Sequence, residues 1–522
     1  MNYAQLFRAT LPETALEIAA LLVLVTDLGF LRKAALKKRI AIDALLGVAG
    51  CCAAIWVVFA AGWAGFSAGD DLQLAAGGSA GAAQIGILVL TALTLLLLID
   101  SNFTRNAGEY VAVVLMAAAG GLLISAAQDL IVIFTGLELL SLGLYILTAF
   151  AKKSGKSAEA AMKYYLFGGM SAAFLLFGFS YLYGLSGSTS LPKVVLGAYM
   201  SAAHGGWQLL AIALVMIAAG LGFKVAAVPF HLWAPDTYEG APAPAAAFIA
   251  SVSKVASFAL LISISSVAMH WMESLYVAGY VGRGYVTFTV IPPGSPRPQF
   301  APGIISAWPL ILIVLSAASM VVGNLAALVQ SSVRRLLAYS AIAHAGYILL
   351  GLAFFSRTNA SAQAVLYYIL TYGLTTIGAF GVVGVVERAA GSDRMDAFLG
   401  LHKRNPLLAA VLLVLLLSLA GIPPLVGFWA KFNLFAAVLG VSGGALSFTL
   451  VALAVAFSAV SLYYYLQVLK RVYVMPAADE TPIRAHPVTQ AVLALIAAAV
   501  VVMGCFPALL QGWIASFYTP MY

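Results

Sequence analysis

Charged side chains are scarce in this chain. Asp, Glu, Lys and Arg make up only 9% of its 522 residues, whereas hydrophobic residues make up 63%; soluble domains carry about 25% charged residues. A soluble protein could not cover that much apolar surface. Continuous apolar runs at 85–98, 407–420 and 491–503 are parts of segments near the roughly 20 residues of a transmembrane helix. Because these runs do not alternate with polar residues, a transmembrane β-barrel is excluded. We expect an all-α polytopic membrane protein.

Cysteine is almost as rare. Cys51, Cys52 and Cys505 have neither the spacing of a zinc site nor that of a disulfide framework. The chain has no phosphate loop, nucleophile elbow or metal-ligand cluster, so we expect no cofactor and no metal in it. Its net charge of +8 is not arranged as a basic stripe, so we expect no nucleic-acid partner. The N-terminus lacks a basic segment and a cleavage site, so the first helix is expected to be retained.

Polar and Pro/Gly-rich breaks divide the chain into about fourteen spans. We expect them at 10–30, 41–64, 82–100, 108–126, 129–151, 161–184, 206–230, 242–267, 306–330, 335–355, 362–389, 405–437, 445–473 and 487–514. The loops after odd-numbered spans hold most of the 27 Lys and Arg residues. Because positive loops stay in the cytoplasm, both termini are expected to face the periplasm.

Spans 7 and 12 carry signals of interrupted helices. Pro229 follows Lys224 in span 7, and Pro423 and Pro424 precede Lys431 in span 12. Proline removes a backbone donor and clashes with the preceding turn, so both helices should be broken. Broken helices at corresponding positions point to inverted repeats. We therefore expect two inverted five-helix units, with these boundaries: an N-terminal three-helix segment 1–107, a first unit 108–267, a polar periplasmic insert 268–305, a second unit 306–473 and a C-terminal helix 474–522.

Three lysines and one glutamate lie inside apolar spans. An ionised side chain in hydrocarbon costs at least a few kcal/mol, so Glu138, Lys224, Lys254 and Lys431 each need a partner, a water-filled cavity or a task. A buried lysine can lose its proton, whereas an arginine stays charged. We interpret the four as a proton relay in which Glu138 pairs with Lys224. Static ion pairs or snorkelling side chains are the structural alternative.

Two histidines are further candidates for the relay. His344 lies on the second helix of the second unit, the position that Glu138 has in the first. It titrates near neutral pH, but a packing role is equally open. His231 lies near the break in span 7 and is a candidate gate on the cytoplasmic side. Asp236 and Glu239, which follow it, are expected to be solvated loop or helix-capping residues.

The motifs in these spans resemble those of a known family. The stretches at 159–168, 222–242, 253–254, 322–330, 336–347 and 421–431 are similar to the antiporter-like proton-translocating membrane subunits of respiratory complex I, and most of all to the subunit N type. They run across most of both five-helix units. The block at 222–242, which begins Gly-Phe-Lys-Val-Ala-Ala-Val-Pro, is the most specific of them.

The resemblance implies a fourteen-helix fold in a bacterial inner membrane. It implies that the family's essential glutamate is Glu138 and its lysines are Lys224, Lys254 and Lys431. Flavin, iron–sulfur clusters and quinone chemistry would belong to partner subunits, and the partners would be the other membrane and peripheral subunits together with the lipid bilayer. The insert 268–305 departs from the family, in which that connection is generally short.

Three functions therefore remain open. The favoured one is proton translocation driven by electron transfer in other subunits of an NADH–quinone oxidoreductase. A cation/proton antiporter subunit of an Mrp-type complex would share the same motifs. A membrane scaffold would use the buried charges only to fix helix packing.

Overall fold

The computed structural model describes residues 7–63, 74–75, 78–201, 205–277, 307–355, 359–477 and 481–518. Within these ranges the chain is helical except for short connections. Extended segments there pair only through isolated bridges, Leu74 with Ala127, Asp129 with Ser190 and Ser332 with Arg394. The predicted all-α class is confirmed.

The helices follow one another with short connections through most of the chain. Their bounds are α2 (Leu11–Val25), the π-helix η1 (Thr26–Phe30), α3 (Leu36–Trp63), α4 (Gly78–Leu98), α5 (Ala107–Ala126), α6 (Leu130–Thr148), α7 (Gly155–Ser186), α8 (Leu191–Ser201), α9 (Trp207–Val225), α10 (Trp233–Gly240), α11 (Ala243–Val277), α13 (Ala307–Leu328), α14 (Val333–Ala353), α15 (Ala360–Ala390), the 3-10 helix η3 (Met395–Phe398), α16 (Leu401–Arg404), α17 (Pro406–Ala420), α18 (Val426–Val441), α19 (Ala445–Tyr473), α20 (Pro487–Cys505) and α21 (Pro507–Ser516).

Local sequence sets several of these boundaries. The side chains of Asp129, Ser154 and Ser332 accept hydrogen bonds from free backbone N–H groups at the starts of α6, α7 and α14. At the other end, Gly187 and Gly391 adopt the left-handed conformation that terminates α7 and α15 (φ 68° and 70°).

Twelve of the described helices are long and apolar enough to cross a membrane. Two shorter apolar helices, α17 and α18, together make up the predicted span 12. This agrees with a polytopic membrane protein. Most of the predicted insert 268–305 lies outside the described residues, although α11 continues to Val277.

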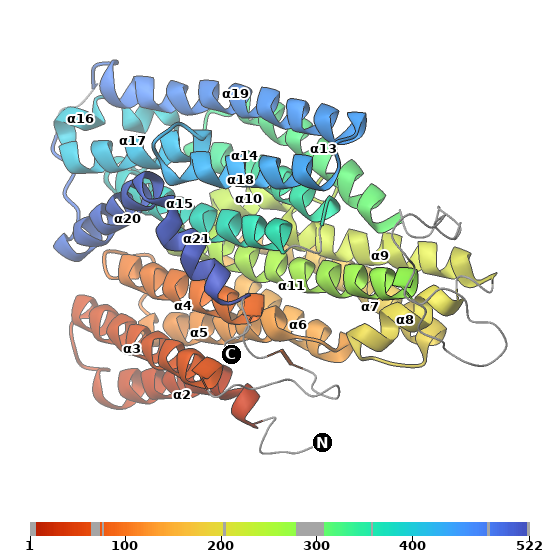
Figure 1. The fold of residues 1–522 in the computed structure, drawn as a ribbon. Helices are drawn as coiled ribbons and strands as arrows, with labels where there is room; N and C mark the ends of the chain where they lie inside the picture. The colour runs from red at the N-terminus through yellow and green to blue at the C-terminus, as the bar shows by residue number, and fades with distance from the viewer. Residues whose placement is uncertain are drawn as a thin grey trace.

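The helices lie side by side in one bundle (Figure 1). The N-terminal α2 and α3 lie at one edge and α19 at the opposite edge, while α11 and α15 run through the middle. Burial agrees with this arrangement. In the most apolar stretch of each helix, 94% of the residues of α14 and 89% of those of α11 are buried, compared with 28% for α19. Lys254 of α11 and His344 of α14 are therefore enclosed by protein.

Candidate functional site

The first helix break lies directly after Lys224. Helix α9 ends at Val225 because Ala226 adopts a left-handed conformation (φ 57°) and Pro229 cannot continue the helix. The break frees carbonyl groups at the end of α9. One of them, that of Phe223, accepts a hydrogen bond from Trp233 Nε1 of α10 at 2.9 Å. The predicted interruption of span 7 is observed.

Lys224 and Glu138 are brought together across α9 and α6. Lys224 Nζ lies 4.0 Å from Glu138 Oε1 and donates a hydrogen bond to Ser141 Oγ, one turn further along α6. The lysine side chain is 7% exposed, but that of Glu138 is 28% exposed. Glu138, although it lies in an apolar span, is therefore only partly buried within this chain. The apolar sequence around it does not reveal which face of α6 it occupies.

Lys254 meets the end of the same broken helix. Its Nζ donates to the carbonyl of Val225, the last residue of α9, at 2.6 Å, and to the carbonyl of Ala341 on α14 at 3.4 Å. An ammonium at a helix C-terminus is favoured by the helix dipole. Because α11 belongs to the first predicted unit and α14 to the second, Lys254 contacts both.

The second break reproduces this contact. Helix α17 ends at Ala420, where Gly421 adopts a left-handed conformation (φ 87°), and the chain resumes as α18 at Val426. Lys431 Nζ donates to the carbonyl of Ala420 at 2.8 Å and to Ser458 Oγ at 2.8 Å. Lys431 follows its break, whereas Lys224 precedes its own. In its contact with a helix end, Lys431 therefore matches Lys254.

His344 lies on α14, one turn beyond Ala341, whose carbonyl binds Lys254. It is 4% exposed, and both Lys254 and Lys431 are close enough to act on it electrostatically. Its Nδ1 shares a hydrogen bond with the hydroxyl of Tyr368 at 2.8 Å. A small cavity of about 10 Å³ adjoins the ring and extends to Ser418 and Gly427 at the second break. That volume is close to the minimum for one water molecule.

His231 does not lie with the buried lysines, Glu138 and His344. It is half-buried in the connection between α9 and α10, and its Nδ1 has no hydrogen-bond partner among the described residues. The structure therefore brings Glu138 to Lys224 and places His344 near Lys254 and the second break, but leaves His231 apart.

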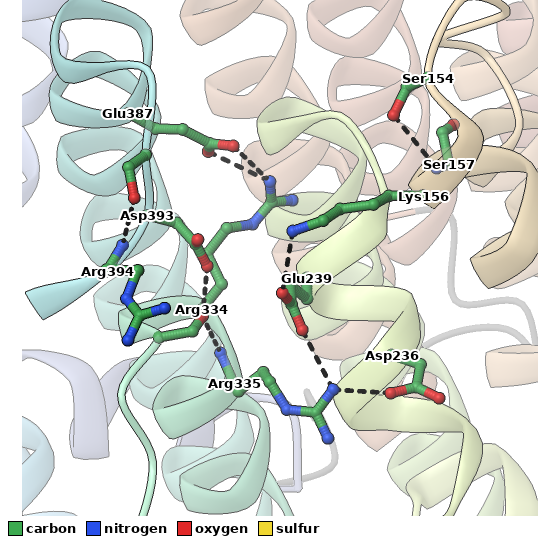
Figure 2. A network of polar contacts seen from close by, with 12 residues as sticks. Ser154, Lys156, Ser157, Asp236, Glu239, Arg334, Arg335, Glu387, Asp393 and Arg394 are labelled. Atoms are coloured by element: carbon green, nitrogen blue, oxygen red, sulfur yellow. Dashed lines mark hydrogen bonds and ion pairs between the residues drawn. The ribbon is translucent and has the colours of Figure 1, made fainter.

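A network of ion pairs joins the helices beyond the first break (Figure 2). Arg335 Nη1 of α14 lies 2.7 Å from Asp236 Oδ1 and 3.0 Å from Glu239 Oε2, both on α10. Lys163 and Lys156 of α7 pair with the same two carboxylates at 2.7 and 3.4 Å. The expectation that Asp236 and Glu239 are solvated loop or capping residues is wrong. Burial raises the pKa of Asp236, but its contacts with Lys163 and Arg335 lower it more, so the net pKa lies below the usual value.

A cavity of about 460 Å³ adjoins this network. Charged side chains from five segments line it: Asp100, Lys156, Glu239, Arg334, Glu387 and Arg388. Arg334 pairs with Glu387 at 3.1 Å. Ala243 and Ala247 of α11 also line the cavity, and Lys254 lies two turns beyond Ala247 on the same face of that helix. The cavity has charged groups among apolar lining residues and is large enough for several water molecules.

Sequence reasoning did not identify the groups that hold the lysines in place. Ser141 and Ser458 bind Lys224 and Lys431, and Tyr368 binds His344. Serine and tyrosine are frequent in membrane helices, so only the register of the packed helices distinguishes these three. Among the described residues, no group of three or more His, Cys, Asp or Glu side chains could hold a metal ion.

A family model described as "NADH:quinone oxidoreductase/Mrp antiporter, TM" matches residues 127–283 and 298–458. The chain is 44% identical over 524 residues to "NADH-quinone oxidoreductase subunit N 2" of Acidobacterium capsulatum, which covers 98% of this chain and 99% of that protein.

Solved structures are similar as well. One chain of respiratory complex I from Thermus thermophilus is 32% identical with a TM-score of 0.74, covering 96% of this chain and 99% of that one. A chain of the Mrp complex from Dietzia sp. DQ12-45-1b, 21% identical, shares the fold with a TM-score of 0.74 over 97% of this chain and 51% of that one. The chain thus belongs to the NADH:quinone oxidoreductase/Mrp antiporter family of transmembrane proteins, as its motifs predicted.

Proposed function

We propose that this chain is a proton-translocating membrane subunit of an NADH–quinone oxidoreductase. It carries no redox group itself; flavin and iron–sulfur clusters belong to partner subunits, whose electron transfer drives the movement of protons here. The chain lies in the bacterial inner membrane with both termini on the periplasmic side. The full-length likeness to a subunit N supports this assignment.

The observation that carries the proposal is the row of titratable groups through the interior of the bundle. Glu138 and Lys224 form its first pair, Lys254 links the two units, and Lys431 lies at the second break. His344 bridges the interval between Lys254 and Lys431. Buried ionisable groups in membrane helices are costly and mark ion pathways.

The contacts suggest how a proton would pass along the row. When Glu138 is ionised and close, it favours the ammonium form of Lys224; when the pair separates, the lysine releases its proton. Lys254 and Lys431 are held by neutral carbonyl and hydroxyl oxygens, with no carboxylate in contact among the described residues, so either can lose a proton without leaving an unpaired anion. His344 accepts a proton from one side and donates it to the other.

The charge-lined cavity supplies the cytoplasmic entrance of this route. It borders α11 at Ala247, two turns from Lys254. Water there would carry protons from the cytoplasm to the centre of the bundle. The ion pairs of Arg335 with Asp236 and Glu239 hold α10 against α14, and both helices contribute residues to the lining of the cavity.

The partial exposure of Glu138 supports an assembly with other membrane subunits. A carboxylate with 28% of its side chain exposed, in the middle of a membrane helix, would face lipid if the chain stood alone. A neighbouring subunit packed on this face of α6 would cover it. That neighbour would then be able to change the charge of Glu138.

Replacing Lys224 with alanine tests the proposal. In the assembled complex, reconstituted into liposomes, Lys224→Ala should abolish NADH-driven proton uptake while leaving the subunit in place on a native gel. Normal uptake by an assembled variant would exclude the relay.

An Mrp-type cation/proton antiporter subunit is the second candidate, favoured by the shared family description and fold. The two differ in their partners. Co-purification of NADH-oxidising subunits with the tagged chain supports the first proposal, and co-purification of other antiporter subunits alone supports the second.

A scaffold role is favoured by one observation: Lys254 and Lys431 each bind the last carbonyl of a broken helix. A scaffold predicts that neutral replacements of the row keep full pumping whenever the complex assembles. The relay predicts that pumping is lost although assembly is kept.

A further inference from the structure

A second group of buried charges lies far from the relay, at the hairpin between α2 and α3. Asp27 is in the π-helix η1 that ends the first span, and it is 2% exposed. Arg39 and Asp43 follow on α3, one turn apart and therefore on the same face. Asp43 is completely buried. π-helical turns often occur at functional sites.

Asp27 is paired with Arg39. Arg39 Nε and Nη2 donate to its two oxygens at 2.7 and 2.8 Å, a bidentate geometry. The first turn of α5 packs directly against it, since a Cβ placed on Gly108 would lie 2.8 Å from Asp27 Oδ2. The positive end of the α5 dipole adds to the attraction of Arg39.

Asp43 has no comparable partner. Neither of its oxygens has a hydrogen-bond donor among the described residues. Arg39, one turn before Asp43 on the same face of α3, binds Asp27, so the two carboxyl groups lie on the same side of the helix. The charged groups that act on Asp43 are Asp27 from η1 and Arg39 from α3, and Glu109 from α5 acts on Arg39. Carboxylates only accept hydrogen bonds, so two ionised groups cannot bond to each other.

Charge balance leads to the same conclusion. One arginine is already bound to Asp27 through both carboxylate oxygens. A second buried carboxylate would remain uncompensated, and an unpaired buried charge is strongly destabilising. Two carboxyl groups that share such a site retain one proton between them.

We propose that Asp27 and Asp43 form a proton-binding site, separate from the relay, in which Asp43 carries the proton and donates it in a hydrogen bond to Asp27. The bound proton completes the contact between the N-terminal three helices and α5, the first helix of the first five-helix unit. The site fastens that segment and takes no part in the route from Glu138 to Lys431.

Asp43→Asn tests this site, because the amide replaces the neutral acid and supplies a permanent donor. The assembled complex is heated at pH 5, 6, 7 and 8, and the loss of this subunit is followed. A carboxyl that is protonated only in the folded chain loses stability as pH rises, because the unfolded chain releases that proton. The stability of Asp43→Asn relative to the native chain should therefore increase by up to tenfold in the folding equilibrium per pH unit while the folded chain still holds the proton, and it should level off once the folded carboxyl ionises.

Two controls sharpen the test. Proton uptake driven by NADH should be unchanged in Asp43→Asn, which separates this site from the relay. The native complex should show the same stability with sodium or choline chloride at equal ionic strength. Parallel pH profiles for the native chain and Asp43→Asn would overturn the proposal. Failure of Asp43→Asn to assemble would also overturn it, because it would show that the charge of Asp43 is needed. Stabilisation of the native complex by sodium, lost in Asp43→Asn, would overturn it as well, because it would assign the site to a metal cation.

Discussion

Neutralising Glu138 should remove the interaction that sets the charge of Lys224. In Glu138→Gln the side chain keeps its size and loses its charge. In the native chain, Glu138 Oε1 and Lys224 Nζ lie 4.0 Å apart. At an effective dielectric constant of about 20, two unit charges at that distance interact with about 4 kcal/mol. The ammonium form of Lys224 would therefore become roughly a thousandfold less favourable relative to the neutral amine.

The assay is NADH-driven proton uptake by liposomes that contain the assembled complex, normalised to the amount of this subunit. Glu138→Gln should reduce proton uptake to a small fraction of that of the native complex. Glu138→Asp keeps the charge and should retain a substantial part of it. Ser141→Ala removes the hydroxyl that binds Lys224 but keeps both charges, so its effect should be smaller than that of Glu138→Gln. Full uptake in Glu138→Gln would refute the coupling of the pair.

Two further predictions concern the second unit. His344→Leu removes the bridge between Lys254 and Lys431, so proton uptake should fall at least tenfold while the complex assembles; His344→Gln, which can still bond to Tyr368, should assemble equally well and show the same loss. Gly427→Ala places a Cβ in collision with the carbonyl oxygen of Ser418, so it should destabilise the subunit by about 1–3 kcal/mol in thermal unfolding of the complex. Gly440→Ala on the same helix meets no atom within 4 Å and is the matched control; equal stability of the two variants would contradict the packing of α18 on α17.

The sequence predicted the architecture well because apolar length and proline position act locally. Pro229, Pro423 and Pro424 mark both breaks, and each break is found where these residues stand. The exposure of Glu138 could not be predicted, since it depends on which face of α6 is covered by neighbouring helices. The predicted inversion of the two five-helix units stays a prediction.

The candidate site was predicted in part. The residue types alone drew attention to the lysines, because an ammonium in an apolar span requires an explanation. Their partners were not predictable. Lys254 binds a carbonyl 29 residues before it, and Arg335 pairs with Asp236 99 residues before it. Such contacts depend on the packing of whole helices, which periodicity does not encode.

Lys254 contacts both predicted five-helix units. Its ammonium binds the carbonyl groups of Val225 at the end of α9 and Ala341 of α14. In the proposed relay, a proton that moves between the units would pass through Lys254. Lys254→Met keeps the length of the side chain and removes the charge. Ser257→Ala, one turn further along α11, removes a buried hydroxyl that has no partner among the described residues and serves as the control.

The most direct measurement is the number of protons taken up per NADH oxidised by liposomes containing Lys254→Met, compared with Ser257→Ala and the native complex. The relay predicts that the Lys254→Met complex assembles and that its uptake per NADH falls well below that of the other two. An unchanged ratio in an assembled Lys254→Met complex would contradict a continuous route through this chain.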